Sequence, residues 1–184
     1  RNINQMNLFI SRTLHTDVLT ESARNYYLGQ VYGLRAYYMY QLYRSWGDVV
    51  FTEEPSLGFE VGKLAKAATP AAEIFEQVKK DIESSLSYFG SDYTIKEKKS
   101  LWSKAATLML KADVYLWSAH RDGGEGDART AKNALVDIQN NISRSNLDLM
   151  DTYQGVFAYD NKGNKEIIFT IHNELFEYLS LIHI

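Results

Sequence analysis

The sequence predicts an all-α, mainly helical protein with one short strand, and two kinds of observation support the helical class. Apolar residues recur at steps of three and four over several long segments, which is the spacing of one helix face. Threonine, serine and proline stand where helices would begin, and glycine stands where they would end. One short stretch, Lys165–Ile171, alternates weakly and is β-branched in the manner of a strand. We therefore expect helices joined by long loops, with a short strand near the C-terminal end.

Composition sets the outer bounds of the prediction. The chain has 184 residues, of which 45% are apolar and 23% are charged, as in an ordinary globular domain with a sizeable core. The net charge is −3 with both signs mixed along the chain, so there is no basic stripe for nucleic acid. No apolar run approaches the ~18 residues of a membrane span. The cysteine count of zero excludes disulfides, thiolate metal sites and a cysteine nucleophile within this stretch.

The residues at both ends are unlike ordinary termini. The chain begins with Arg1 instead of methionine and shows no signal-like segment, so we expect any targeting signal to lie upstream. Leu179–Ile184, read back as codons, matches a transposon-end adapter of sequencing libraries. We interpret this stretch as an assembly artefact and take the domain to be residues 1–178. The alternative is a genuine apolar helix end.

The first predicted helix covers Asn2 to about Leu19. Its apolar positions have helical spacing and are Ile3, Met6, Phe9, Ile10, Leu14 and Val18. It has no clear start signal. Thr20 then suits the N-cap of the next helix, because its hydroxyl can accept a hydrogen bond from an unpaired backbone N–H.

The second predicted helix, within Thr20–Asp48, is the centre of the expected fold. It contains seven of the thirteen tyrosines. One face carries apolar or aromatic residues at steps of three and four, namely Tyr27, Val31, Leu34, Tyr38 and Leu42. Other tyrosines fall on the remaining sides, which predicts a helix covered by neighbours on several sides. Gly47 can adopt the left-handed conformation that closes it.

A loop of about twenty residues follows Asp48 and is longer than most connections in a compact domain. Thr69 and Pro70 then mark a helix start, Thr69 as the cap and Pro70 as the first helical residue. The predicted buried stripe of this helix has period four and consists of Ile74, Val78, Ile82 and Leu86. Gly90 is expected to close the helix.

Two further helices are predicted in the second half of the chain. Ser100 is expected to cap a helix from Leu101 to about His120, where small residues at 105, 106 and 112 allow close helix packing. A glycine-rich turn over 121–127 separates it from a shorter amphipathic helix over 128–142. Paired helices of this kind suggest tetratricopeptide-like units, although no repeat of about 34 residues is visible.

Four motifs, taken in order, resemble the SusD/RagB family. They are Gly33–Tyr38 (GLRAYY) followed by Arg44–Asp48 (RSWGD), Pro70–Ile82, Lys104–Leu116, and Tyr153–Phe169 with its NKEIIF ending. Each motif alone is weak, and the four together span roughly residues 1–178. The resemblance implies an α-α superhelix and an outer-membrane, cell-surface lipoprotein with a lipid anchor upstream. It also implies capture of an oligosaccharide, less often a peptide, for delivery to a TonB-dependent transporter.

Catalytic, metal and cofactor chemistry has little support in the sequence. The four histidines are scattered without the spacing of a metal site, and Gly123–Gly126 lacks the GK[ST] of a phosphate loop. Asp122, Glu125 and Asp127 lack the ligand order of a calcium-binding hand. We therefore expect no catalytic residue, no metal and no cofactor.

Aromatic residues outside the predicted helix cores are the remaining signal. Sugars place their C–H faces on flat rings, and tyrosine and tryptophan combine a large apolar face with a polar edge. We expect most tyrosines of the central helix to be core residues. For Trp46, the alternative to a ligand contact is a structural role at the turn after this helix. The predicted ligand-binding residues are Trp46, Asp48, Phe51, Phe59, Tyr93 and Tyr159.

Two other functions remain open at this point. The helices also suit an intracellular tetratricopeptide-like scaffold that binds a peptide or protein partner, although the NKEIIF and WGD motifs argue against it. A helical-barrel glycoside hydrolase would need two carboxylates about 5–10 Å apart across its substrate. Glu53, Glu54 and Glu60 are its only candidates in the long loop, and a charged solvent loop is the simpler interpretation.

Overall fold

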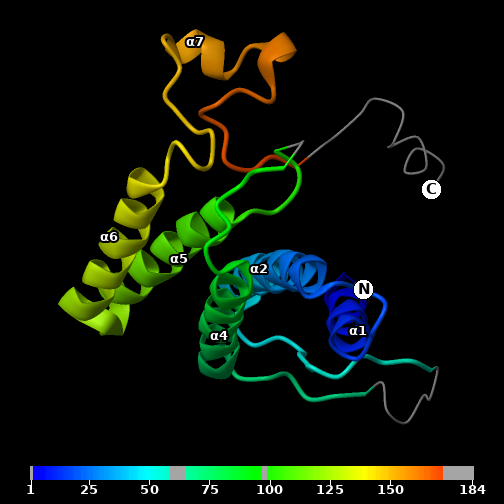
Figure 1. Ribbon diagram of the computed structural model, residues 1–184. Coiled ribbons are helices and arrows are strands. Elements are labelled where there is room, and N and C mark those ends of the chain that lie inside the picture. The colour runs from blue at the N-terminus through cyan, green and yellow to red at the C-terminus, as the bar shows by residue number, and fades with distance from the viewer. Residues whose placement is uncertain (1, 59–64, 97–98, 172–184) are drawn as a thin grey trace, which may run out of the picture.

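The computed structural model describes residues 2–58, 65–96 and 99–171. The long helices are α1 (Asn2–Leu14), α2 (Glu21–Trp46), α4 (Ala71–Phe89), α5 (Lys104–Ser118) and α6 (Gly124–Asn140), labelled as in Figure 1. A π-helical segment, Ala119–Gly123, joins α5 to α6. The short helix α7 (Tyr153–Val156) and a 3-10 turn, Tyr159–Asn161, follow. The all-α prediction is therefore confirmed.

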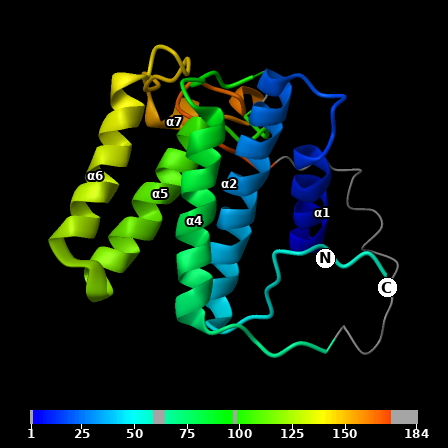
Figure 2. The same cartoon turned by 60° about the horizontal axis from the view of Figure 1, so that its bottom comes forward.

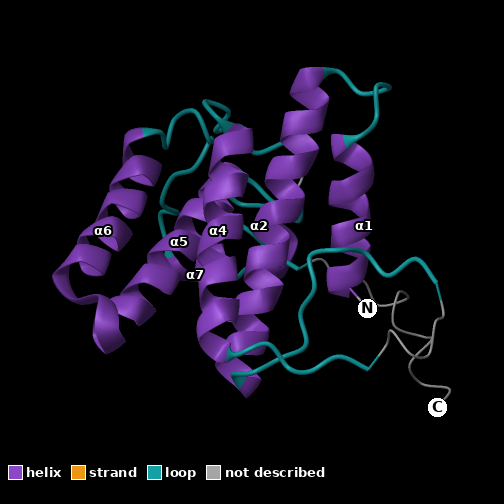
Figure 3. Cartoon of the chain, turned by 90° about the horizontal axis from the view of Figure 1, so that it is seen from below, coloured by secondary structure: helices purple, strands orange, loops and turns teal. Residues whose placement is uncertain are grey.

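The long helices lie side by side in the order α6, α5, α4, α2 and α1 (Figures 2 and 3). Helix α2 packs most extensively on α4, and α5 packs most extensively on α6. Helix α1 covers the side of α2 that α4 leaves open. The central position predicted for α2 is therefore confirmed, because α1, α4 and α5 all contact it.

Both ends of α2 follow the predicted local chemistry. The Thr20 hydroxyl accepts a hydrogen bond from the Ala23 N–H at 3.3 Å, as an N-cap does. Gly47 has φ of +72°, and its N–H donates to the Tyr43 carbonyl at 2.9 Å. A residue with a side chain would be strained in this conformation.

The face that α2 buries differs from the predicted one. Tyr27 and Tyr38 of the predicted stripe are 41% and 37% exposed. The side chains that α2 buries are Leu28, Arg35, Ala36, Met39 and Tyr40. A helix with apolar residues nearly all round does not specify its inner face by periodicity.

Two glycines determine how closely other elements approach α2. A Cβ at Gly33 would lie 2.0 Å from Trp102 Nε1, and a Cβ at Gly29 would lie 3.0 Å from the Phe89 ring. Trp102 is itself held by a hydrogen bond from Nε1 to Thr107 Oγ1 at 2.7 Å. The two glycines therefore lie on the buried face of α2 and let Phe89 and Trp102 approach its backbone.

Two clusters of buried residues form the core. The first lies among α2, α4 and α5 and consists of Ala36, Met39, Tyr40, Ile74, Val78, Ile82, Phe89, Trp102, Ala106, Leu110 and Val114. The second lies mainly between α5 and α6 and consists of Tyr93, Ala105, Leu108, Ala112, Ala131, Ala134, Ile138 and Leu147. The predicted stripe of α4 is confirmed at three of its four positions, because Leu86 is only partly buried. The alanines of the second cluster allow the close packing predicted for α5.

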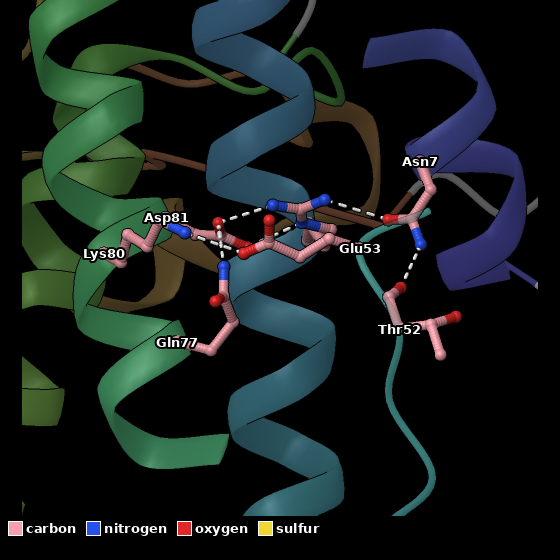
Figure 4. A network of polar contacts seen from close by, with 7 residues as sticks. Asn7, Thr52, Glu53, Gln77, Lys80 and Asp81 are labelled. Carbon is pink, nitrogen blue, oxygen red and sulfur yellow. Dashed lines mark hydrogen bonds and ion pairs between the residues drawn. The ribbon is translucent and has the colours of Figure 1, made fainter. Parts of the chain in front are cut away.

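A buried polar network joins α1, α2, α4 and the loop after α2 (Figure 4). Arg35 forms two hydrogen bonds to the Asp81 carboxylate, both 2.7 Å long, and donates to Asn7 Oδ1 at 2.9 Å. Asn7 in turn donates to the Thr52 carbonyl. The start of the long loop is therefore tied to the helical core rather than solvated on all sides.

Several predicted helix boundaries are wrong. Helix α1 ends at Leu14 instead of about Leu19, and Val18 is 91% exposed. Ser103, not Ser100, caps α5, because its hydroxyl accepts from the Ala106 N–H at 3.2 Å. Residues 100–102 form a bend that directs Trp102 into the core. Capping residues three positions apart look alike in sequence, and burial of Trp102 selects the second one.

Two other segments also differ from the prediction. The glycine-rich turn predicted over 121–127 is helical, since it contains the π-helical segment and the first turn of α6. The strand predicted over Lys165–Ile171 is not formed. This segment contains turns, and its backbone hydrogen bonds to other segments include those from Asp148 N to the Lys165 carbonyl and from Thr170 N to the Lys99 carbonyl. Ile168 and Phe169 instead pack partly against the first core cluster.

Candidate ligand-binding site

Two of the predicted ligand-binding residues are available to a ligand. Trp46 is the last residue of α2 and is 70% exposed. Tyr159 begins the 3-10 turn and is 86% exposed, with the Lys162 ammonium 4.1 Å from its ring centroid. The two are not brought together, since α7 and the turn after it lie well away from α2 (Figure 1).

Two other predicted ligand-binding residues, Phe51 and Tyr93, pack against the core. Phe51 is partly buried against the first core cluster. Tyr93 is 9% exposed, and its hydroxyl donates to Asp137 Oδ1 at 2.7 Å. Desolvation and this hydrogen bond raise the pKa of Tyr93 to about 12. Phe59 and Glu60 lie outside the described residues.

Asp48 has a structural partner. Its Oδ1 accepts a hydrogen bond from the backbone N–H of Ala71, the first residue of α4, at 2.8 Å. The sequence predicted Thr69 in this capping role. Thr69 instead forms an antiparallel bridge with Val49 through two backbone hydrogen bonds.

A hollow of about 470 Å³ lies beside these residues, and we call it the terminal groove. It forms where the last turn of α2, the first turns of α4 and the π-helical segment after α5 meet. Its aromatic residues are Tyr43, Phe75 and Trp117. Its charged residues are Glu76, Lys79, Arg121, Asp122 and Asp127. The groove thus offers flat apolar rings together with hydrogen-bonding groups.

The rings of the terminal groove are fixed by neighbouring rings. Tyr43 and Phe75 have centroids 4.9 Å apart. Tyr40, fully buried, stacks on Tyr43 at 6.4 Å and meets Trp117 edge-on at 6.5 Å. Such ring pairs add to the stabilisation from buried area. The aromatic surface is therefore formed before any ligand arrives.

Cations also lie against this aromatic surface. The Lys79 ammonium is 4.9 Å from the Phe75 centroid and 3.2 Å from Glu76 Oε1. The Arg44 guanidinium is 5.9 Å from the Trp117 centroid and pairs with Asp113 at 3.6 Å. Both cations therefore lie over ring faces and add donors to the aromatic surface.

The π-helical segment shapes one wall of the terminal groove. A π-helix has a wider turn than an α-helix and often occurs at functional sites. It contributes Arg121, Asp122 and Gly123 to the groove. A Cβ at Gly123 would lie 1.9 Å from Asp127 Oδ2, and Gly124 has φ of +55°. The backbone conformation of Gly124 therefore favours glycine, whereas a side chain at position 123 would require Asp127 to move.

The sequence predicts a glycine-rich turn over 121–127, because glycines usually interrupt helices. The structure instead makes this segment helical, and Arg121 and Asp122 are exposed as a solvated position would have them. The adjacent Gly123 and Gly124 were the available signal, since paired glycines between two helices can also mark a close approach. Trp117 and Tyr43 gave no signal, because their spacing is that of ordinary core residues.

A second hollow of about 390 Å³ is less suited to a polar ligand. It is lined by apolar residues of α2, α5 and the segment 166–169, with Asp113 and Glu166 as its only charged members. Asp113 pairs with Arg44, and Glu166 accepts a hydrogen bond from Met150 N at 2.9 Å. Few polar groups remain to orient a ligand there.

The described residues do not assemble a metal centre, and Glu53 does not have the properties of a general acid. Within 2–58, 65–96 and 99–171, no three His, Asp or Glu side chains gather as metal ligands. Glu53 is paired with Lys80 at 2.7 Å, and this hydrogen bond lowers the pKa of Glu53. A general acid needs a raised pKa instead. Among the helices that the structure describes, none has the length and apolarity to cross a bilayer.

Comparisons with known proteins support the resemblance drawn from the four motifs. No family model matches the chain. A SusD-like protein of Formosa agariphila is 34% identical over 113 residues, which is 60% of this chain and 20% of that protein. A SusD-like protein of Bacteroides ovatus is 25% identical over 152 residues, or 80% of this chain and 26% of that protein. The resemblance to SusD proteins is therefore confirmed.

Solved structures give the same result for the fold. NanU of B. fragilis has a TM-score of 0.86 at 48% identity, over 96% of this chain and 34% of that structure. A SusD superfamily protein of Bacteroides vulgatus has a TM-score of 0.83 at 45% identity, over 96% of this chain and 35% of that structure. A surface glycan-binding protein of Bacteroides thetaiotaomicron in complex with laminarihexaose shares the fold, with a TM-score of 0.70 at 21% identity. The tetratricopeptide-like superhelix is thus confirmed, and the chain spans about a third of each structure.

Proposed function

Because this chain resembles SusD superfamily proteins in sequence and fold over nearly its whole length, we propose that it is part of a cell-surface oligosaccharide-binding protein. In this proposal the whole protein is a lipid-anchored component of the outer membrane. It captures an oligosaccharide and passes it to a TonB-dependent transporter. It breaks no bond and is not an enzyme.

The terminal groove is the observation that carries the binding part of the proposal. Tyr43, Phe75 and Trp117 line the hollow with aromatic rings, against which we place the C–H face of a pyranose. Arg121 and Asp122 are exposed at the same hollow and can meet sugar hydroxyls as donor and acceptor. This pairing of flat apolar area with a few polar groups suits a ligand that is apolar on one side and hydroxylated at its edge.

The rings of the terminal groove are already in place, which favours binding of an oligosaccharide without any reaction. The rings are held by Tyr40 and by one another, so little side-chain freedom is lost on binding. An open groove of about 470 Å³ admits one or two sugar rings and lets them leave again. The other exposed candidates, Trp46 and Tyr159, are proposed as additional contacts for a longer chain.

Substitution at Trp117 tests this proposal. The protein is first screened against an array of oligosaccharides, laminarihexaose among them, and binding is then titrated by calorimetry. Trp117→Ala should weaken binding about tenfold, because the sugar loses one of the rings that it packs against. Trp117→Phe keeps a ring and should lose less.

Tyr153→Ala is the matched control, since Tyr153 is an 80% exposed aromatic residue outside the groove. Chromatography of the incubated sugars checks that none is cleaved. The proposal is rejected if no sugar on the array binds, or if the oligosaccharide is hydrolysed. Equal affinities for Trp117→Ala and the parent chain would exclude the terminal groove as the site.

A further inference from the structure

Asp48 connects the end of one groove-forming helix to the start of another. It directly follows Gly47, which ends α2, and its Oδ1 accepts from the Ala71 N–H at 2.8 Å. The two residues are 23 positions apart in the sequence. Asp48 therefore lies at the end of α2 but caps the start of α4.

Helix α4 depends on this distant carboxylate. The first N–H groups of an α-helix have no partner within the helix. Pro70 stands at the N-cap position and has no side-chain cap to offer. The backbone N–H and C=O of Thr69 are both used by Val49. A carboxylate at this end also interacts favourably with the helix dipole.

The residues on both sides of this connection line the terminal groove. Gly47 N donates to the carbonyl of Tyr43, which lines the groove from α2. Ala71 and Phe75 line it from α4. The Cβ position of Gly47 is 3.9 Å from Ala71 Cβ, so the two helix ends are in close contact.

We propose that Asp48 is a positioning residue of the terminal groove. Its carboxylate fixes the first turn of α4 against the last turn of α2 and thereby sets the separation of Phe75 and Tyr43. It acts through the Ala71 amide and does not touch the sugar. The effect on sugar affinity rests on the proposed function, whereas the effect on the α4 start does not.

Three substitutions at Asp48 test this role. Asp48→Ala removes the acceptor, while Asp48→Asn and Asp48→Ser retain an oxygen that caps helices well. Hydrogen exchange over residues 70–76 reports the start of α4. Calorimetric titration with laminarihexaose, or with the best oligosaccharide of the array, reports the groove. Glu54→Ala is the control, because Glu54 is an exposed carboxylate of the same loop.

Asp48→Ala should speed exchange over residues 70–76 and weaken sugar binding about tenfold, on the scale of one lost cap. In Asp48→Asn and Asp48→Ser, the exchange rate and the sugar affinity should stay near the parental values. Thermal melting confirms that each variant folds. The inference is overturned if Asp48→Ala keeps parental exchange and affinity. It is also overturned if Asp48→Asn keeps the slow exchange but loses affinity, since Asp48 would then contact the sugar through its charge.

The proposed function and this inference fail in different ways. If the parental chain binds no sugar, the proposed function fails, and exchange over residues 70–76 alone decides whether Asp48 holds α4. If the parental chain binds and Asp48→Ala binds equally well, only the positioning role fails.

Discussion

Arg35 and Asp81 form a buried ion pair in which both carboxylate oxygens accept a hydrogen bond of 2.7 Å from the guanidinium. Their side chains are only 5% and 1% exposed. Gln77 donates a further hydrogen bond to Asp81 Oδ1 at 2.9 Å. The pair joins the middle of α2 to the middle of α4, where water cannot replace a missing partner.

Removing one member of this pair should destabilise the fold strongly. Asp81→Ala leaves the Arg35 charge buried and unpaired, which costs about 3–5 kcal/mol in other proteins. Urea unfolding followed by circular dichroism measures the loss. Lys165→Ala removes an exposed ion pair with Asp148 and should cost less than about 1 kcal/mol. A small loss for Asp81→Ala would show that water reaches the guanidinium.

Gly33 should tolerate no side chain. Gly33→Ala would place a Cβ 2.0 Å from Trp102 Nε1 and 2.9 Å from Thr107 Oγ1. Overpacking of this kind typically costs about 1–3 kcal/mol. Gly126→Ala is the control, because a Cβ there meets nothing within 4 Å and alanine favours helix by up to about 1 kcal/mol. The two variants should therefore shift the melting temperature in opposite directions.

Tyr93 should make stability depend on alkaline pH. Its pKa is raised from 10.0 to about 12 by desolvation and by the hydrogen bond to Asp137. The unfolded chain loses this proton first, so the contribution of Tyr93 is complete below pH 10 and is lost as pH rises toward 12. Tyr93→Phe should remove this part of the decline. Denaturant unfolding of both proteins between pH 8 and pH 12 tests it, and parallel curves would contradict it.

Arg121 should contribute to binding without contributing to stability. It is exposed at the terminal groove, so Arg121→Ala should weaken oligosaccharide binding about tenfold through a lost charged donor. The free energy of unfolding should change by less than about 0.5 kcal/mol. Arg129→Ala is a matched control, because Arg129 pairs with Glu125 on the exposed side of α6. Equal affinities for the two variants would count against a ligand contact at Arg121.

Local signals in the sequence identified the helices, whereas contacts between distant segments determined which face of α2 is buried and which residue caps α4. The stripe of Ile74, Val78 and Ile82 is buried as predicted. On a helix that is otherwise mostly polar, apolar residues at a period of four leave one face that can be buried. Gly47 closes α2 as predicted. The sequence did not predict the inner face of α2, because Trp102, which packs against Gly33, lies far away in the sequence. It also did not predict the cap of α4, because Asp48 is 23 residues from Ala71.

The candidate ligand-binding residues were harder to predict than the fold. Exposed aromatic residues in predicted loops led to Trp46 and Tyr159, which remain candidates. The same rule led to Tyr93, which the second core cluster buries. The terminal groove instead draws on helical residues such as Trp117, whose exposure depends on how three helix ends meet. Such a meeting point leaves no periodic pattern in any single helix.

The π-helical segment Ala119–Gly123 has a consequence for how related sequences can diverge. A π turn holds one residue more than the α turn that it replaces. Deleting one residue there would restore an ordinary α turn and remove the wider turn that carries Arg121 and Asp122. The positions of both side chains at the terminal groove would then change in one step. Single-residue insertions and deletions at this place are therefore expected to alter the wall of the groove more than single substitutions do.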